Sequence, residues 1–178
     1  MNVLLGVTAS VAAIRAARIA RSLQQFGAVR AMFTPAAVHF LERSEDAWPD
    51  GVEILFDADE WKAWNELGDP VLHIELRKWA DVLVIAPASA DFLAKAAHGF
   101  SDNLALSVCR AWDFAKPMIV APAMNTMMWD HPVTQTHLAT LERWGVRIVA
   151  PIEKQLACGD VGIGAMADVD AIVGAVPR

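Results

Sequence analysis

The amino-acid sequence predicts an α/β protein built around a doubly wound parallel sheet, in a single domain over residues 1–178. Short apolar runs alternate along the chain with segments of helical periodicity, which is the pattern of parallel strands joined by covering helices. A chain of 178 residues suits one domain with a full-sized core. Its 55% hydrophobic content fits both a sheet buried on its two faces and an oligomer that buries apolar surface between subunits.

The first half of the sheet is predicted from three apolar runs. Residues 3–7 form the first strand, and a serine that can cap a helix leads into helical periodicity over 11–26. Residues 29–33 form the second strand. The next helix, 35–41, is opened by a proline, whose fixed φ angle suits the first helical position. A shorter apolar run predicts a third strand at 52–56.

The second half continues the same alternation. Residues 82–86 read Val-Leu-Val-Ile-Ala, a run typical of a strand buried on both faces. Helical patterns follow over 91–97 and 103–112, and residues 118–121 form the next strand. The sheet therefore grows by one strand after each helical segment.

The C-terminal part begins regularly and then loses its pattern. A helix is predicted over 132–144 and the last strand over 146–149. Beyond Pro151 the periodicity weakens, and glycines at three positions between 155 and 168 indicate a loop. We expect a mobile substrate flap at about 152–168.

Composition excludes several classes of function. The net charge of -6 argues against a nucleic-acid partner, which requires a basic surface. No apolar run is long enough to cross a membrane, and the first residues begin a strand instead of a signal peptide. The two cysteines, Cys109 and Cys158, form neither a metal-ligand spacing nor a disulfide framework. We therefore expect a cytoplasmic protein with no metal.

The segment from Gly6 to Ala13 joins the first strand to the first helix. Its small residues let a ligand approach the backbone, and hydroxyl and amide groups at a helix N-terminus suit a phosphate. It lacks the G-x-G-x-x-G spacing, so a dinucleotide is not indicated. A capped helix that binds nothing explains the segment equally well.

Two Ala-Pro-Ala turns, at 86–88 and 121–123, each follow a buried strand. Open α/β sheets bind ligands at the carboxyl ends of their strands, so the two turns could shape one crevice. Either turn alone is better explained as an ordinary connection between a strand and a helix. Asn125 follows the second turn and places one amide side chain at the start of a predicted helix.

A histidine and a cysteine are further candidates for chemistry. His73 lies near a helix start indicated by Pro70, where it could bind an anion or act as a base, although a lone histidine is more often structural. Cys158 lies in the glycine-rich segment, where a thiol can transfer protons. Cys109, in an apolar helix, is better explained as a small buried hydrophobe.

Three separated motifs carry a family resemblance. They are Leu-His-Ile-Glu-Leu-Arg-Lys-Trp-Ala-Asp at 72–81, Pro-Ala-Met-Asn at 122–125, and Leu-Ala-Cys-Gly-Asp at 156–160 leading to Gly-Ala-Met-Ala at 164–167. In this order they resemble the homo-oligomeric flavin-containing cysteine decarboxylases, and within them the plant and animal type. The resemblance runs from Val3 to about Asp168.

This resemblance implies a Rossmann-like, flavodoxin-like subunit in a trimer or a trimer-based assembly, with FMN at the subunit interface. The implied catalytic residues are His73, Asn125 and Cys158. The positions that match flavin-binding residues are Ser10, Val11, Ala12, Thr34, Pro35, Ala36, Ser89, Ala90 and Ala123. The implied substrate-binding residues are Asn125, Met124, Met166, Arg15 and Lys78.

The chemistry of the family has a physical reason. The carboxylate of a cysteine cannot leave as carbon dioxide, because the carbanion left behind has no electron sink. FMN oxidises the side chain to a thioaldehyde, which supplies that sink, and decarboxylation then gives an aminoenethiol. By resemblance, Asn125 fixes the carboxylate, His73 assists the oxidation or orients the substrate, and the closed flap excludes water.

The chain departs from the family pattern near the flavin and in the flap. Asp91-Phe92 replaces the usual Asn-Thr, which puts a carboxylate where it would repel the FMN phosphate unless turned away. Gln155 stands at a flap position that is usually basic. Arg15 and Lys78 exchange Arg and Lys relative to the pattern, so cations for a substrate phosphate remain.

Two substrates fit the resemblance, and a third role belongs to another class. We place first a peptide with a C-terminal cysteine, converted to an aminovinyl-cysteine precursor, because Gln155 and Asp91-Phe92 depart from the coenzyme A enzymes. Phosphopantothenoylcysteine, in coenzyme A biosynthesis, is the alternative, favoured by Cys158 as a proton donor to the enethiol. A non-catalytic flavin-binding regulator of phosphatases ranks last, because His73, Asn125 and Cys158 are all present.

Overall fold

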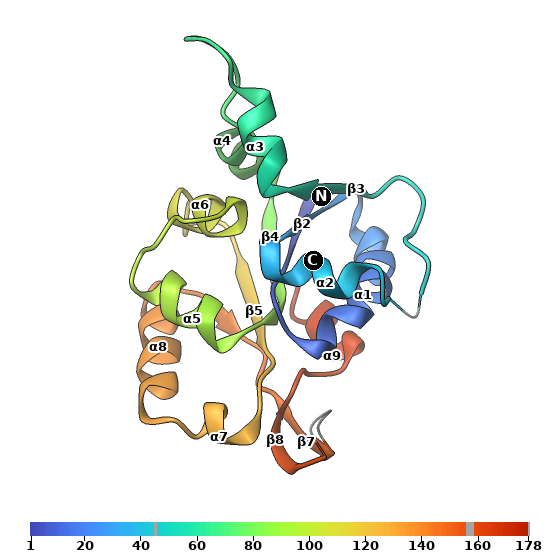
Figure 1. The fold of residues 1–178 in the computed structure, drawn as a ribbon, viewed down its shortest axis with the longest axis vertical. Helices are drawn as coiled ribbons and strands as arrows, with labels where there is room; N and C mark the ends of the chain where they lie inside the picture. The colour runs from blue at the N-terminus through green and yellow to red at the C-terminus, as the bar shows by residue number, and fades with distance from the viewer. Residues whose placement is uncertain (45, 156–158, 178) are drawn as a thin grey trace.

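The computed structural model describes residues 1–44, 46–155 and 159–177, and within them it contains a six-stranded parallel sheet of order β3-β2-β1-β4-β5-β6 (Figure 1). In this doubly wound order, the strands up to β3 are added on one side of β1, and the strands from β4 onward are added on its other side. The predicted fold class is therefore confirmed. The strands are β1 (Val3–Val7), β2 (Val29–Phe33), β3 (Glu53–Phe56), β4 (Val82–Ala88), β5 (Met118–Pro122) and β6 (Arg147–Ile148).

The central strands are buried on both faces. All five residues of β1 and all seven of β4 are buried. Along β1 the side chains alternate between two apolar clusters, with Val3, Leu5 and Val7 in one and Leu4 in the other. One cluster contains residues of α1 (Ala16–Leu23) and α9 (Val169–Gly174). The other contains residues of α4 (Leu72–Trp79), α5 (Ala90–Ala97), α6 (Leu104–Arg110) and α8 (Pro132–Arg143). The continuous apolar runs seen in the sequence follow from this burial on two sides.

The predicted helices are present, with local differences. The segment predicted as one helix over 11–26 is a 3-10 turn (Val11–Arg15), the helix α1 and a second 3-10 turn (Gln24–Phe26). The helix after Pro35 also begins as a 3-10 turn (Pro35–Ala37). The α-helices are α1 (Ala16–Leu23), α2 (Val38–Leu41), α3 (Asp57–Ala63), α4 (Leu72–Trp79), α5 (Ala90–Ala97), α6 (Leu104–Arg110), α7 (Thr126–Trp129), α8 (Pro132–Arg143) and α9 (Val169–Gly174).

The segment predicted as a loop contains an antiparallel hairpin. Its strands are β7 (Ile152–Gln155) and β8 (Val161–Ala165). Glycines usually weaken a strand, which is why the sequence pattern indicated a loop. Here they serve a close approach, because a Cβ atom at Gly162 would collide with the side chain of Thr126 and one at Gly164 with the carbonyl of Met124.

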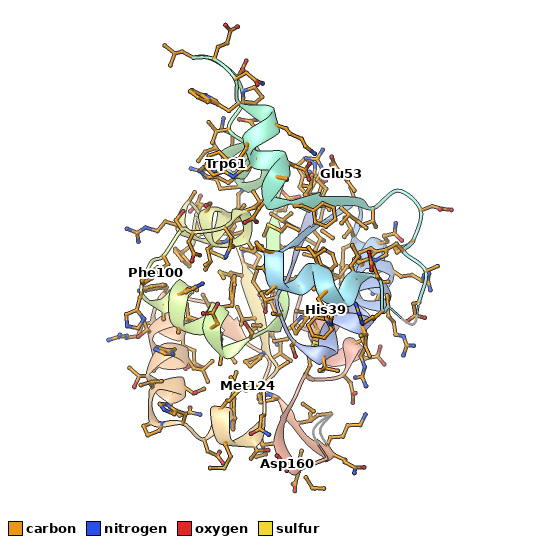
Figure 2. All side chains as sticks on the ribbon, in the orientation of Figure 1. His39, Glu53, Trp61, Phe100, Met124 and Asp160 are labelled. Atoms are coloured by element: carbon orange, nitrogen blue, oxygen red, sulfur yellow. The ribbon has the colours of Figure 1, made fainter. Side chains whose placement is uncertain are left out.

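Two parts of the chain extend from opposite ends of the sheet. Figure 1 shows α3 and α4 at one end and the β7-β8 hairpin with α7 at the other. Figure 2 shows the same separation for labelled side chains, with Trp61 of α3 far from Met124 and Asp160. None of the helices in the described residues is long and apolar enough to span a membrane.

Candidate active site

Two adjoining hollows lie where β1, β4 and β5 end. One has a volume of about 400 Å³ and the other about 460 Å³, and both are lined by Ala9, Ser89, Ala90 and Met128. We call the two hollows together the crevice. The first hollow contains the predicted flavin residues Ser10, Val11, Ala12, Ser89, Ala90 and Ala123. The second contains Thr34, Pro35, Ala36, Ser89 and Ala90. All nine predicted flavin positions thus meet in one crevice, at the sheet edge where α/β proteins bind ligands.

A buried threonine ties the two loops of this crevice together. The Thr8 hydroxyl donates to the Pro87 carbonyl at 2.9 Å and accepts the Ser89 N–H at 2.8 Å. Ser89 in turn caps α5 by accepting the Phe92 N–H, and Ser10 caps the first 3-10 turn. Sequence reasoning missed Thr8, although a hydroxyl directly after a buried strand could have indicated it.

Lys95 pairs with the Asp91 carboxylate in the wall of the second hollow. Lys95 lies 3.3 Å from the Asp91 carboxylate and 3.0 Å from that of Asp102. The hydrogen bonds to Asp102 and then to Asp91 raise the pKa of Lys95 above its usual value. Because Asp91 is paired with a cation, its charge repels an anion in the crevice less than the sequence alone indicated.

Asn125 is held in one orientation at the mouth of the first hollow. It caps α7, and its Oδ1 accepts the Met127 N–H at 2.8 Å. Since a backbone N–H can only donate, the other amide atom is Nδ2, which donates to the Asp160 carboxylate at 2.8 Å. The remaining predicted substrate residues that line this hollow are Met124, Met166 and Arg15, joined by Lys154 and Gln155 of the hairpin.

His73 and Lys78 lie elsewhere in the chain. Both belong to α4, where His73 Nδ1 lies 2.6 Å from Glu60 of α3 and Lys78 pairs with Glu75 at 2.9 Å. In the part of the chain that the structure describes, neither residue lines the crevice. The structure therefore does not bring them together with Asn125 in one subunit. Cys158 lies outside the described residues.

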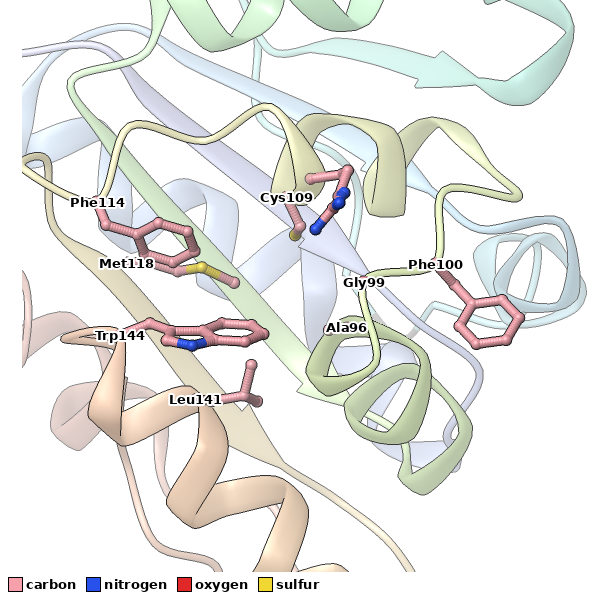
Figure 3. Close-up of a pocket in the computed structure, with 9 residues that line it drawn as sticks. Ala96, Gly99, Phe100, Cys109, Phe114, Met118, Leu141 and Trp144 are labelled. Carbon is pink, nitrogen blue, oxygen red and sulfur yellow. The ribbon is translucent and has the colours of Figure 1, made fainter.

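A third cavity, of about 370 Å³, lies between α5, α6 and α8 (Figure 3). Its walls are mostly apolar and include Phe114, Met118, Leu141 and Trp144. Cys109 also lines it, and burial raises the pKa of its thiol to about 12, which agrees with a buried hydrophobe. Because this cavity contains none of the predicted site residues, we do not assign the chemistry to it. The described residues hold no cluster of three or more side chains that could bind a metal.

Comparison with known proteins identifies the class. The Flavoprotein family model matches residues 1–178, so the chain belongs to that family. A phosphopantothenoylcysteine decarboxylase of Arabidopsis thaliana is 50% identical over 98% of this chain and 83% of its own length. The predicted family and the predicted enzyme class, an FMN-dependent decarboxylase, are confirmed.

Solved structures agree with this assignment. A mutant PPC decarboxylase in complex with pantothenoylaminoethenethiol is 49% identical, with a TM-score of 0.93 over 97% of this chain and 94% of that one. The FMN binding protein AtHal3 is also 49% identical, with a TM-score of 0.88 over 97% of this chain and 92% of that one. The predicted FMN cofactor is therefore confirmed.

The prediction that placed a peptide substrate first is wrong. The structure of an FMN-dependent cysteine decarboxylase from thioviridamide biosynthesis is only 26% identical, with a TM-score of 0.72 over 84% of this chain and 89% of that one. The two departures behind that prediction have a structural explanation. Asp91 pairs with Lys95, and Gln155 shares the crevice wall with Lys154, which supplies a cation next to it.

Proposed function

We propose that this protein decarboxylates phosphopantothenoylcysteine, with FMN held in the crevice. The observation that carries the proposal is the 50% identity, over 98% of the chain, to a protein named for that activity. The crevice fits the cofactor, because its hollows fall within the about 300–1,000 Å³ typical of such sites and its walls combine small apolar residues with a few hydroxyl and charged side chains. FMN, when bound, supplies the oxidation that lets the carboxylate leave.

Different residues of the first hollow bind different parts of the substrate. Asn125 binds the carboxylate through Nδ2, because its Oδ1 is committed to the Met127 N–H. Met124 and Met166 provide apolar walls for the part of the substrate beside the reacting sulfur. Arg15 and Lys154 supply two cations for the substrate phosphate.

We infer that a neighbouring copy of the chain supplies His73 and Lys78. These residues lie on α4, at the end of the molecule opposite the β7-β8 hairpin (Figure 1). The adjoining segment exposes large apolar side chains, with Trp61 77% and Leu67 97% exposed, which favours a protein partner there. A homotrimer, or an assembly of trimers, would bring the α4 of one copy to the crevice of the next.

The β7-β8 hairpin is our candidate for the flap predicted at about 152–168. It contributes Lys154 and Gln155 to the crevice wall, so its movement would open and close that wall. Closure would exclude water from the reacting cysteine. Cys158, in the same segment, is proposed as the proton donor to the enethiol. A cytoplasmic location also remains a prediction.

Mass spectrometry of the reaction products tests the function. The FMN-loaded protein would be incubated with phosphopantothenoylcysteine and, separately, with a peptide ending in cysteine. We expect loss of carbon dioxide from phosphopantothenoylcysteine, without net loss of hydrogen if the reduced cofactor returns its two electrons to the product and Cys158 supplies the proton. Recovery of unchanged phosphopantothenoylcysteine from a fully FMN-loaded protein would refute the proposal.

A further inference from the structure

The amide that we assign to the substrate carboxylate already binds a carboxylate of the protein. Asn125 Nδ2 donates to Asp160 Oδ2 at 2.8 Å, and the two residues are 35 positions apart in the chain. Asp160 directly precedes β8, so this bond connects the β7-β8 hairpin to the start of α7. A carboxylate oxygen at hydrogen-bonding distance from Nδ2 is the same chemical group that the substrate would present there.

Two glycines fix the position of Asp160. The Met124 N–H donates to the Gly164 carbonyl at 2.9 Å, so β8 lies directly against the segment that carries Asn125. At Gly162 the strand approaches Thr126 so closely that a Cβ atom would lie 2.5 Å from the threonine hydroxyl. Backbone contacts therefore hold the hairpin against the Met124–Thr126 segment. These contacts determine the position of Asp160, which directly precedes β8.

We propose that Asp160 is a specificity-determining residue that holds the carboxylate site of Asn125 until a carboxylate ligand replaces it. The argument rests on the proposed function, in which Asn125 binds the substrate carboxylate. Two carboxylates on one amide would repel each other at this short range, so the substrate carboxylate and Asp160 bind in turn. A ligand that has no carboxylate leaves the Asn125–Asp160 bond intact.

The exchange also favours release of the product. Decarboxylation removes the one group of the ligand that competes with Asp160. Asp160 then returns to Asn125. Asp160 acts here through Asn125 and the hairpin, and it takes no part in the chemical step.

Ligand titration of the FMN-loaded protein tests this exchange. One probe is the serine analogue of phosphopantothenoylcysteine, which keeps the carboxylate but has no sulfur to oxidise. The other is the same compound with hydrogen in place of the carboxylate. Binding of each is followed through the flavin absorbance, in the wild type and in Asp160→Ala and Asp160→Asn. Glu153→Ala is the matched control, because it removes one negative charge from the same hairpin without lining the crevice.

The measured quantity is the ratio of the two affinities. We expect Asp160→Ala to raise the affinity for the carboxylate probe relative to the other probe by about tenfold, the effect of one hydrogen bond to a charged group. Asp160→Asn should raise the ratio less, because its amide oxygen still accepts from Asn125. Glu153→Ala should leave the ratio within about twofold.

The ratio separates the possible results. If Asp160→Ala loosens the hairpin and weakens both probes equally, the unchanged ratio overturns the proposal, and a lower ratio does so as well. Turnover of phosphopantothenoylcysteine by the wild type is measured in parallel. Its absence would refute the proposed function itself, whereas normal turnover with an unchanged ratio would refute only the role of Asp160.

Discussion

Glu60 holds His73 through two atoms of its carboxylate at once. Oε1 lies 2.6 Å from His73 Nδ1, and Oε2 accepts the His73 backbone N–H at 3.0 Å. Because an ionised carboxylate only accepts, Nδ1 carries the proton, and Nε2 is the nitrogen that can meet a ligand. The carboxylate of α3 thus sets both the tautomer and the direction of the imidazole on α4.

Glu60→Gln should therefore slow catalysis more than it weakens substrate binding. An amide cannot accept from both donors of His73, so the imidazole loses its fixed tautomer. We expect kcat to fall about tenfold with KM within about twofold, and Glu60→Ala to lower kcat further. Glu66→Gln, a nearby exposed carboxylate, is the control that should change neither constant. An equal fall of kcat in Glu60→Gln and in Glu66→Gln would mean that Glu60 has no specific role.

Mixing two inactive variants tests whether neighbouring subunits share the site. If one copy supplies His73 and the next supplies Asn125, co-expressed His73→Asn and Asn125→Asp chains form some sites with both native residues. In a randomly mixed ring about a quarter of the interfaces carry that combination, so activity should recover to about that fraction of the wild type. A site within one chain would give no recovery above the separate variants.

The regular part of the fold could be predicted because its signals are local. Residues 3–7 and 82–86 are apolar runs buried on both faces, residues 29–33 are apolar and buried except at Arg30, and each is a strand in the structure. The hairpin was missed for a non-local reason. Gly162 and Gly164 weaken the strand pattern, yet the approach of β8 to Met124 and Thr126 leaves no room for a side chain at either position.

The candidate site likewise has a part that local sequence signals predict and a part that they do not. Ser10, Ser89 and Ala123 follow buried strands, so the topology alone brings them to one crevice. The Asn125–Asp160 bond joins residues 35 positions apart, and no sequence spacing indicates it. The separation of His73 from that crevice depends on where α3 and α4 lie in space, which one sequence does not reveal.

Gly164→Ala should unseat the hairpin. Gly164 has a φ of +148°, and an added Cβ would collide with the Met124 carbonyl, so the bond from the Met124 N–H would be strained or lost. We expect the free energy of unfolding to fall by about 1–3 kcal/mol. Tryptic cleavage after Lys154 should also become faster, because cleavage follows the population of the open hairpin.

Gly174→Ala provides the contrast for that measurement. Gly174 ends α9, and an added Cβ there would meet no atom within 4 Å. This variant should keep the wild-type cleavage rate and be equally stable or up to about 1 kcal/mol more stable. Equal cleavage rates in both variants would show that the close approach at Gly164 does not hold the hairpin.

Cys109 should make stability fall at alkaline pH. Burial raises the pKa of its thiol from 9.0 to about 12. Between these values the unfolded chain loses the thiol proton while the folded chain keeps it, so the unfolded state binds fewer protons. The protonated thiol makes its full contribution to the free energy of unfolding below about pH 9. As the pH rises beyond that value, the free energy of unfolding falls with a slope that approaches about 1.4 kcal/mol per pH unit.

Urea unfolding of the wild type and of Cys109→Ala, at fixed protein and FMN concentrations, isolates this effect. At pH 8 the variant should be less stable by about 1 kcal/mol, because it leaves a small cavity in the wall formed with Met118 and Leu141. Between pH 8 and pH 10 that difference should shrink by about 1.4 kcal/mol and reverse sign. The comparison cancels the lysines, which titrate in both proteins, and the sequence contains no tyrosine. A difference that stays constant up to pH 10 would mean that the Cys109 thiol ionises as readily in the folded protein as in the unfolded chain.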